Sequence, residues 1–285
     1  MMNIEPFFDE RTYTLTYVVW DAQTKDAVVI DPVLDFEPSN GRIWAESVDV
    51  VTKYVKDHQL KLHYIFETHA HADHLSGSQY IRRQVGGQVA ISERIKGVQA
   101  VFRDVFGWPE MKADGSQFDR LLVDNEVVEA GALRIKVLPT PGHTPACSSF
   151  MINDAVFTGD ALFVEDVGVG RCDFPKGDAS ALYDSVQQQL FTLPDNTRVF
   201  VGHDYPPATR KWQAETTIGA AKKANAHLTA GLGREDFIAK RKARDATLAA
   251  PRLLFPSIQV NIAAGNLPAG EDGRVFLKAP VKVAM

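Results

Sequence analysis

The sequence has few of the features that mark secreted, membrane-bound or nucleic-acid-binding proteins. Only two of its 285 residues are cysteines, too few for a disulfide framework. No apolar stretch is long enough to span a bilayer, and the first nine residues carry Glu5 and Asp9 instead of a signal peptide's apolar run. The net charge is −5, and no basic stripe offers the cations that phosphate binding needs. We therefore expect a cytoplasmic, bacterial protein with no nucleic-acid or membrane partner.

The composition is that of a large folded domain. Hydrophobic residues make up 45% of the chain and charged residues 24%, which is typical of globular proteins. No low-complexity linker divides the sequence, so we expect a single domain over residues 1–285, with residues from about 210 to 285 as an extension packed on it. The last part, from about 245, is rich in proline and glycine, and residues 257–262 fit one more strand.

Short apolar strands and helical patterns alternate along the chain. The hydrophobic periodicity predicts strands at residues 13–20, 27–30, 64–67, 88–91, 121–123, 127–128, 133–138, 148–152, 156–157 and 198–201. It predicts helices at residues 43–56, 75–84, 93–102, 179–190, 212–223 and 235–244. The second half thus repeats the order of the first: strands, helix, strand, helix. Two such halves can pack sheet against sheet, so the expected fold is a four-layer αββα sandwich of the α/β (α+β) class.

Four polar segments each follow directly on a short apolar strand. They contain His69, His71, Asp73 and His74, then His143, then Asp160, and finally His203. In α/β sheets, ligands collect outside the carboxyl ends of the strands. Five of the eight histidines are therefore expected at one rim of the sheets.

The spacing within the first of these segments suits a metal ion. His69, His71 and Asp73 alternate by two, so extended backbone projects all three to one side, and His74 can join them where the chain turns into a helix. Imidazole and carboxylate ligands suit a transition metal such as Zn²⁺ or Fe²⁺. A lone histidine after a strand is more often a hydrogen-bonded structural residue. Three histidines and an aspartate within six positions would be costly to bury without a metal.

The motif around these residues makes the sequence resemble a known family. His-x-His-x-Asp-His, found here at residues 69–74, is the hallmark of the metallo-β-lactamase superfamily, and the resemblance covers about residues 10–210. Within it, the chain is similar to the glutathione-linked branch of glyoxalase II and the persulfide (sulfur) dioxygenases. Residues 143–147 resemble the dioxygenase segment His-Thr-x-x-Cys, and residues 159–162 and 170–174 resemble its Gly-Asp-Ala-Leu and Gly-Arg-x-Asp-Phe pair. His-Asp-Tyr at residues 203–205 also matches, although glyoxalase II has a similar Gly-His-Glu-Tyr.

The resemblance implies an oxidoreductase that oxidises glutathione persulfide with O₂ to sulfite. A single Fe²⁺ would be held by His69, His143 and Asp160, a two-histidine, one-carboxylate set that leaves open positions for substrate and O₂. The side chains expected to stand behind this set and orient it are His71, Asp73, His74 and His203. A homo-oligomer, either a dimer or a tetramer, is also expected.

Glutathione is an anionic peptide, so its pocket needs cationic and hydroxyl donors. Arg171 can fork onto a carboxylate, although a salt bridge to Asp173 or Asp166 is an equal alternative. Tyr205 and His227 resemble substrate-contacting residues of the family, with rim packing as the alternative for Tyr205. Two departures from the family pattern stand out. Residues 164–169 are two residues longer, which leaves the place of Arg171 open, and residues 105–117 form an insertion that could shape the entrance or a subunit interface.

Four other functions remain open at the sequence level. A glyoxalase II-like thioester hydrolase would hold two Zn²⁺ ions with the same residues, and Asp160 would bridge them. A non-catalytic metal or thiol sensor on the same fold would bind without turnover. A β-lactamase or nuclease is less favoured, because the former usually has a different ligand set at its second metal and the latter needs a basic surface.

Overall fold

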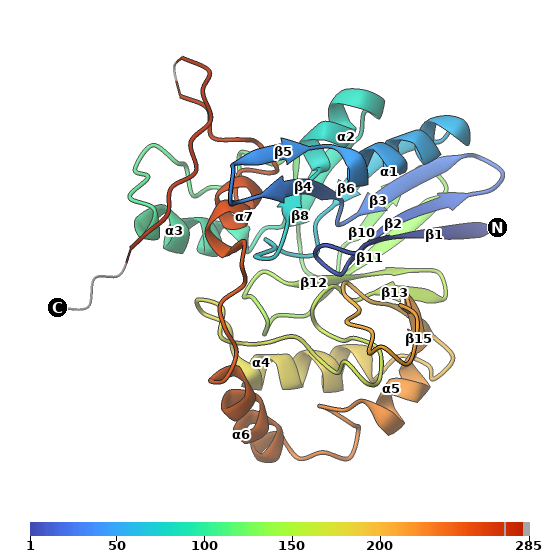
Figure 1. The fold of residues 1–285 in the computed structure, drawn as a ribbon. Coiled ribbons are helices and arrows are strands. Elements are labelled where there is room, and N and C mark those ends of the chain that lie inside the picture. Colours follow the sequence, from blue (N-terminus) through green and yellow to red (C-terminus); the bar gives the residue numbers. More distant parts are fainter. Residues whose placement is uncertain (271, 282–285) are drawn as a thin grey trace.

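Two six-stranded sheets face each other, with helices on their outer sides (Figure 1). The computed structural model describes residues 1–270 and 272–281. The first sheet has the order β1 (Met2–Asp9), β2 (Thr14–Asp21), β3 (Asp26–Ile30), β6 (Lys61–Phe66), β8 (Gln88–Ser92) and β9 (Arg120–Leu122). The second has the order β10 (Val127–Ala130), β11 (Leu133–Pro139), β12 (Ser148–Ile152), β13 (Ala155–Phe157), β14 (Arg198–Phe200) and β15 (Glu215–Thr217).

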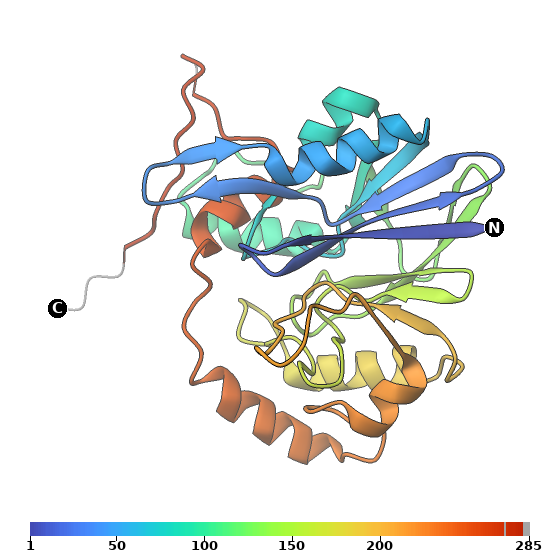
Figure 2. The same cartoon turned by 45° about the vertical axis from the view of Figure 1, so that its right-hand side comes forward.

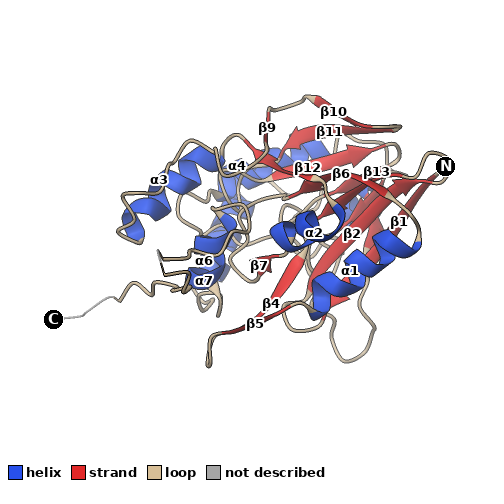
Figure 3. Cartoon of the chain, turned by 90° about the horizontal axis from the view of Figure 1, so that it is seen from above, coloured by secondary structure: helices blue, strands red, loops and turns tan. Residues whose placement is uncertain are grey.

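The helices complete the four layers. Helices α1 (Glu46–Asp57), α2 (Ser78–Val85) and α3 (Ile95–Val105) belong to the first sheet's side. On the second sheet's side lie α4 (Ala179–Asp184), the π-helix η1 (Ser185–Leu190), α5 (Ile218–Ala224) and α6 (Arg234–Asp245). A small sheet of β5 (Arg42–Trp44), β4 (Val33–Glu37) and β7 (Leu75–Ser76) lies beside the first sheet, as the view from above shows (Figure 3). The predicted αββα sandwich is confirmed.

Alternation along the strands explains why two sheets can pack on one another. In β2, Leu15, Tyr17 and Val19 belong to the core between the sheets, whereas Val18 and Trp20 belong to the core under the helices. Successive side chains of a strand point to opposite faces, so a strand apolar at every position is covered on both. Central strands such as β2, which is buried on both faces, thus favour the sandwich, whereas β10 and β11 keep an exposed face.

The C-terminal segment crosses from one side of the sandwich to the other (Figure 2). Phe237 of α6 packs into the core of the second sheet, and α7 (Leu254–Asn261) packs into the core under the first sheet's helices through Ile258 and Val260. No helix among the described residues is long and apolar enough to cross a membrane.

Several predicted elements are wrong in kind or extent. Residues 257–261 belong to helix α7 and Ile262 is its C-cap, instead of forming a strand; polar and apolar residues alternate here in sequence as in a strand, although all of them are buried in the helix. The helix predicted at 212–223 begins only at Ile218, where Thr217 caps it by accepting a bond from the Ala220 amide; residues 215–217 pair with β14. The helices predicted at 43–56 and 75–84 begin at Glu46 and Ser78, since the residues before them pair in the small sheet.

One buried hydroxyl links the two sheets. Tyr17 of β2 donates to the carbonyl oxygen of Val201 at 2.6 Å and to that of Ala214 at 3.2 Å, both beside strands of the second sheet. We predict that Tyr17→Phe lowers the free energy of unfolding by about 1–2 kcal/mol, because buried acceptors lose their donor. Denaturant titration measures this. Tyr80→Phe, which removes an exposed hydroxyl bond to Asp49, is the control and should change stability by less than about 0.5 kcal/mol. Equal losses in both variants would contradict the assigned role.

Candidate metal centre

The structure brings all seven predicted metal-site residues to one rim of the sandwich. His69, His71, Asp73 and His74 follow β6, while His143, Asp160 and His203 follow β11, β13 and β14. Among the described residues, three groups of possible ligands have donor atoms within 4.8 Å of one another; Asp31, Glu67 and His71 form one of them, and the other two contain only predicted site residues. The first group is His69, His143 and Asp160; the second is His71, Asp73 and His203.

The first group contains the three residues predicted to hold iron. Nε2 of His143 lies 3.4 Å from Asp160 Oδ2, and Nε2 of His69 lies 4.0 Å from the same oxygen. All three side chains are nearly or fully buried. Metal–ligand bonds of about 2.1 Å at tetrahedral or octahedral angles separate ligand atoms by roughly 3–3.5 Å. The group is therefore close to the spacing that one metal ion requires.

Hydrogen bonds fix which nitrogen of each histidine faces the centre. Thr68 Oγ1 donates its proton to Asp31 Oδ2 at 2.7 Å, so it can only accept from His69 Nδ1, 3.0 Å away. His143 Nδ1 lies 2.6 Å from the carbonyl oxygen of Arg171, which is likewise only an acceptor. Both rings therefore carry their proton on Nδ1, and their Nε2 lone pairs point toward Asp160.

The second group is backed by two buried carboxylates. His71 Nε2 lies 3.0 Å from Asp31 Oδ1 and 3.5 Å from Glu67 Oε2. Burial by itself lowers the pKa of His71, but the two carboxylates outweigh it and raise that pKa well above its usual value. Asp31 holds a backbone φ of +50°, unusual for a non-glycine residue, and its carboxylate also accepts the Thr68 amide at 2.7 Å. One aspartate thus orients residues of both groups.

Asp160 joins the two groups, and His203 lies on its other side. Asp160 Oδ2 faces His69 and His143, while Oδ1 lies 3.4 Å from His203 Nε2. His203 Nδ1 bonds to the carbonyl oxygen of Tyr13 at 3.2 Å. His74 stands next to the second group, with Nδ1 3.0 Å from Asp73 Oδ2. The arrangement offers one complete metal site and the donor atoms of a second.

Several of these donor atoms form no hydrogen bond within the described part of the chain. Among the described residues, no hydrogen bond reaches the buried atoms His69 Nε2, His71 Nδ1, His74 Nε2 and Asp160 Oδ1. Buried polar atoms are almost always paired in native proteins, and leaving them unpaired is costly. Burial, followed by the neighbouring His71 and His143, lowers the pKa of His69 well below its usual value, so this ring is neutral and its lone pair available. The donor set fits a metal ion.

Two pockets among the described residues are lined by Asp160 of the centre. One of about 280 Å³ is lined by Asp73, His143, Asp160 and His203, and also by Arg11, Arg252 and residues just before α7. The other, of about 250 Å³, reaches from Asp160 to His227. Arg171 and Tyr205 line both pockets. The three predicted substrate-binding residues therefore all line pockets that reach the centre.

Arg171 is partly used by the protein itself. Its Nε and Nη2 each donate to Asp173 at 2.6 Å, and Nη1 donates to the carbonyl oxygen of Ala249 at 2.8 Å. The salt bridge proposed as the alternative is thus present with Asp173, whereas Asp166 pairs with Arg210 at 2.7 Å. Arg171 still contributes a cationic wall to the pockets.

The longer segment at residues 164–169 is docked against His227. The amide of Val169 donates to His227 Nδ1 at 3.2 Å, and Asn225 donates to the carbonyl oxygen of Gly168 at 2.9 Å. Gly168 has a φ of +97°, and a Cβ there would lie 2.1 Å from His227 Nδ1, so only glycine fits. Residues 105–117 line neither pocket; Phe106 and Met111 pack under the first sheet's helices, so this insertion does not shape the entrance.

The αββα fold and the buried histidines and aspartates at its rim indicate a class of metal-binding enzymes, and the comparison with known families agrees. The family model described as the metallo-beta-lactamase superfamily matches residues 10–203. The chain belongs to this superfamily.

Proteins similar to this chain carry different names. Glyoxylase B2 of Dictyostelium discoideum is 43% identical over 283 residues, which covers 98% of this chain and 97% of that one. The mitochondrial persulfide dioxygenase ETHE1 of Bos taurus is 32% identical over 237 residues, covering 82% and 78%. A beta-lactamase hydrolase-like protein of Xylella fastidiosa is 42% identical over 280 residues; the match covers 98% of this chain but only 64% of that protein. The crystal structure of ETHE1 from Myxococcus xanthus has a TM-score of 0.73 at 36% identity, covering 93% and 100%.

The two cysteines lie near the centre but away from solvent. Burial raises the pKa of the Cys147 thiol to about 12 and also raises that of Cys172. A thiol reacts as its thiolate, so we predict that iodoacetamide labels neither cysteine in the folded protein at mildly alkaline pH and labels both after denaturation. Mass spectrometry of the alkylated chain reads this out. Rapid labelling of folded Cys147 would contradict the prediction.

Proposed function

We propose that the chain is a glutathione-dependent persulfide dioxygenase. In the proposed reaction, glutathione persulfide, O₂ and water give glutathione, sulfite and two protons. The metal is a single Fe²⁺ held by His69, His143 and Asp160. Bound iron would supply the open coordination positions at which a persulfide sulfur and O₂ can meet.

One observation carries this choice. The Gly-Arg-x-Asp-Phe segment at residues 170–174, by which the sequence resembles the dioxygenases, directly contacts the first group. The carbonyl oxygen of Arg171 fixes the His143 ring through Nδ1, and the ring centroid of Phe174 lies 6.3 Å from that of His143. The distinguishing segment and the proposed iron ligands are thus one structural unit. The likeness to ETHE1 over the full length of the Myxococcus chain agrees with it.

The protein's own residues would hold and orient the reactants. Hydrogen bonds to Thr68 and Arg171 set the direction of the His69 and His143 lone pairs. His203 is anchored through Nδ1, so its Nε2 faces Asp160 at the floor of the pocket. From there it can hold a water or exchange a proton with an oxygen-bearing product.

The pocket beyond Asp160 suits an anionic peptide. His227 accepts a bond at Nδ1, and its pKa is lowered by burial and by the nearby Arg241 and Arg244, so it is a neutral ring with a free Nε2–H donor. Tyr205 is about half exposed and offers a hydroxyl beside the centre. We assign substrate contacts to Arg171, Tyr205 and His227.

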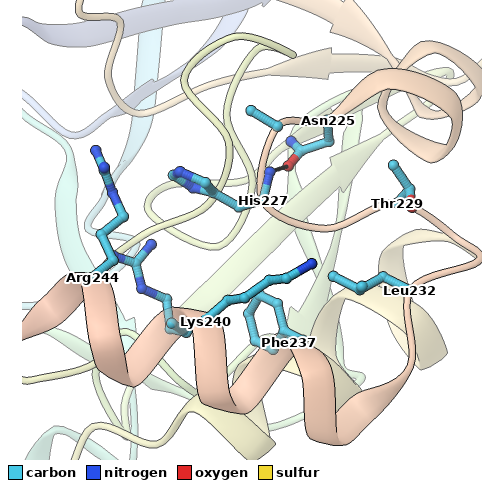
Figure 4. Close-up of a pocket in the computed structure, with 9 residues that line it drawn as sticks. Asn225, His227, Thr229, Leu232, Phe237, Lys240 and Arg244 are labelled. Carbon is cyan, nitrogen blue, oxygen red and sulfur yellow. Dashed lines mark hydrogen bonds between the residues drawn. The ribbon is translucent and has the colours of Figure 1, made fainter.

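A third pocket, of about 260 Å³, continues this one outward and shares His227, Arg241 and Arg244 with it (Figure 4). Lys240 and Arg244 extend from α6 on the side that carries this pocket, and neither forms an ion pair with any described residue. Arg241 is buried and paired with Asp245, yet its Nε has no described partner. A row of cations leading from the metal centre fits a ligand with a second carboxylate, as glutathione has.

An oxygen electrode tests the proposal. Iron-loaded protein should consume O₂ with glutathione persulfide and release sulfite, and it should leave the thioester S-lactoylglutathione intact. Thioester cleavage without O₂ uptake would overturn the proposal in favour of the hydrolase.

The second candidate is a hydrolase with two metal ions, such as Zn²⁺, acting on a glutathione thioester. It is favoured by the second donor group and by the position of Asp160, whose two oxygens face different groups. The 43% identity to glyoxylase B2 adds support. In this candidate, His71, Asp73, His74 and His203 would bind metal directly.

The single-iron assignment predicts different outcomes for two histidine variants. His143→Ala removes a ligand, so bound iron and activity should both be lost. His203→Ala should keep most of the iron while turnover falls about 10- to 100-fold, because only an orienting group is removed. Metal analysis and initial rates measure both effects. If His203→Ala lost its metal as completely as His143→Ala, the single-iron assignment would be contradicted.

The outer pocket predicts a binding effect without a catalytic one. Arg244→Ala should raise KM for glutathione persulfide several-fold, to at most about tenfold, with kcat nearly unchanged, because a solvent-facing ion pair contributes modestly to binding. Lys242→Ala is the control, since Lys242 is exposed on the same helix but lines none of these pockets. An unchanged KM in Arg244→Ala would remove this pocket from the substrate site.

A further inference from the structure

The last residue of α7 contacts the turn that carries half of the metal centre. Asn261 is buried, with 4% of its surface exposed. Its Nδ2 donates at 2.8 Å to the carbonyl oxygens of both His71 and His74, and its Oδ1 accepts the Ser76 amide at 2.7 Å. Both amide protons and the amide oxygen are therefore used on one short stretch of chain, almost 190 residues away in sequence.

Residues near this turn, which spans residues 71–76, also hold it by hydrogen bonds. The hydroxyls of Ser76 and Ser78 donate to Glu67 Oε1, and the other Glu67 oxygen faces His71. Ser76 thus binds Asn261 through its amide and Glu67 through its side chain. Asn261, Ser76, Glu67 and His71 form a continuous chain of polar contacts that ends at an imidazole of the centre.

The segment that carries Asn261 is itself firmly placed. Ile258, Val260 and Ile262 are fully buried in the core under the first sheet's helices. Gln79 of α2 donates to the carbonyl oxygen of Ala264 at 3.0 Å, and Gln99 of α3 donates to that of Ile262 at 2.9 Å. An amide mounted on so rigid a support can fix the position of the backbone that it binds.

We infer that Asn261 is a positioning residue of the metal centre. It fixes the backbone carbonyls on either side of Asp73, and so sets the directions in which His71, Asp73 and His74 project. This inference rests on the metal centre proposed above, but it does not depend on which reaction that centre performs. It assigns to the C-terminal segment a part in metal binding.

The test compares two variants. In each, an apolar side chain of similar size replaces a buried amide that forms hydrogen bonds of the C-terminal segment. Asn261→Leu removes the bonds to His71 and His74, whereas Gln79→Met removes a buried bond to the same segment without touching the turn. The dissociation constants for Co²⁺ and Fe²⁺ are measured by competition with a chelator, and the visible spectrum of bound Co²⁺ reports ligand geometry. Asn261→Leu should weaken binding about 10- to 100-fold and alter the spectrum, as outer-sphere changes do. Gln79→Met should bind within about twofold of the parent.

The inference would be overturned if Asn261→Leu had the metal affinity and the Co²⁺ spectrum of the parent. It would also be overturned if Gln79→Met lost as much metal affinity as Asn261→Leu. Should Asn261→Leu not be recovered folded, Asn261→Ser supports the same comparison with a smaller side chain. The measurement uses neither persulfide nor O₂, so failure of the dioxygenase proposal leaves its result intact.

Discussion

Burying histidine nitrogens and a carboxylate oxygen without hydrogen-bond partners costs free energy that a fold must recover. Here the unpaired atoms converge on one rim, where strands from both sheets end, and the side chains that carry them are held from behind. A metal ion satisfies such a set, and its binding free energy becomes part of the stability of the fold. The strand ends of the sandwich, the histidine tautomers and the buried carboxylates together hold these donor atoms in place.

Asp31 shows how few groups set the geometry. It accepts the Thr68 amide and hydroxyl, through Thr68 it fixes the tautomer of His69, and it faces His71 directly. Its left-handed backbone conformation is the strain that allows one carboxylate to reach both donor groups. In the first group, hydrogen bonds with Thr68 Oγ1 and the Arg171 carbonyl oxygen orient His69 and His143, and in the second, Asp31 and Glu67 face His71.

Much of the centre could be predicted because its donors follow short apolar strands, and strand ends meet at one rim. The supporting residues could not. Asp31 looks like an ordinary turn aspartate in sequence, and Asn261 becomes visible only once α7 is packed against the turn at residues 71–76. Helix α7 itself was missed because Ser257, Gln259 and Asn261 alternate with apolar residues as in a strand, while in the helix all of them are buried. Arg241 and Arg244 of the outer pocket belong to a predicted helix in sequence, and only the structure places them beside His227.

The number and position of metal ions in the native protein test this account most directly. Anomalous diffraction from crystals of protein purified with its own metal, recorded at the iron and zinc absorption edges, would locate each ion. The account predicts one iron ion between His69, His143 and Asp160, with no metal on His71, Asp73 and His203. Two ions bridged by Asp160, whether zinc or iron, would contradict it.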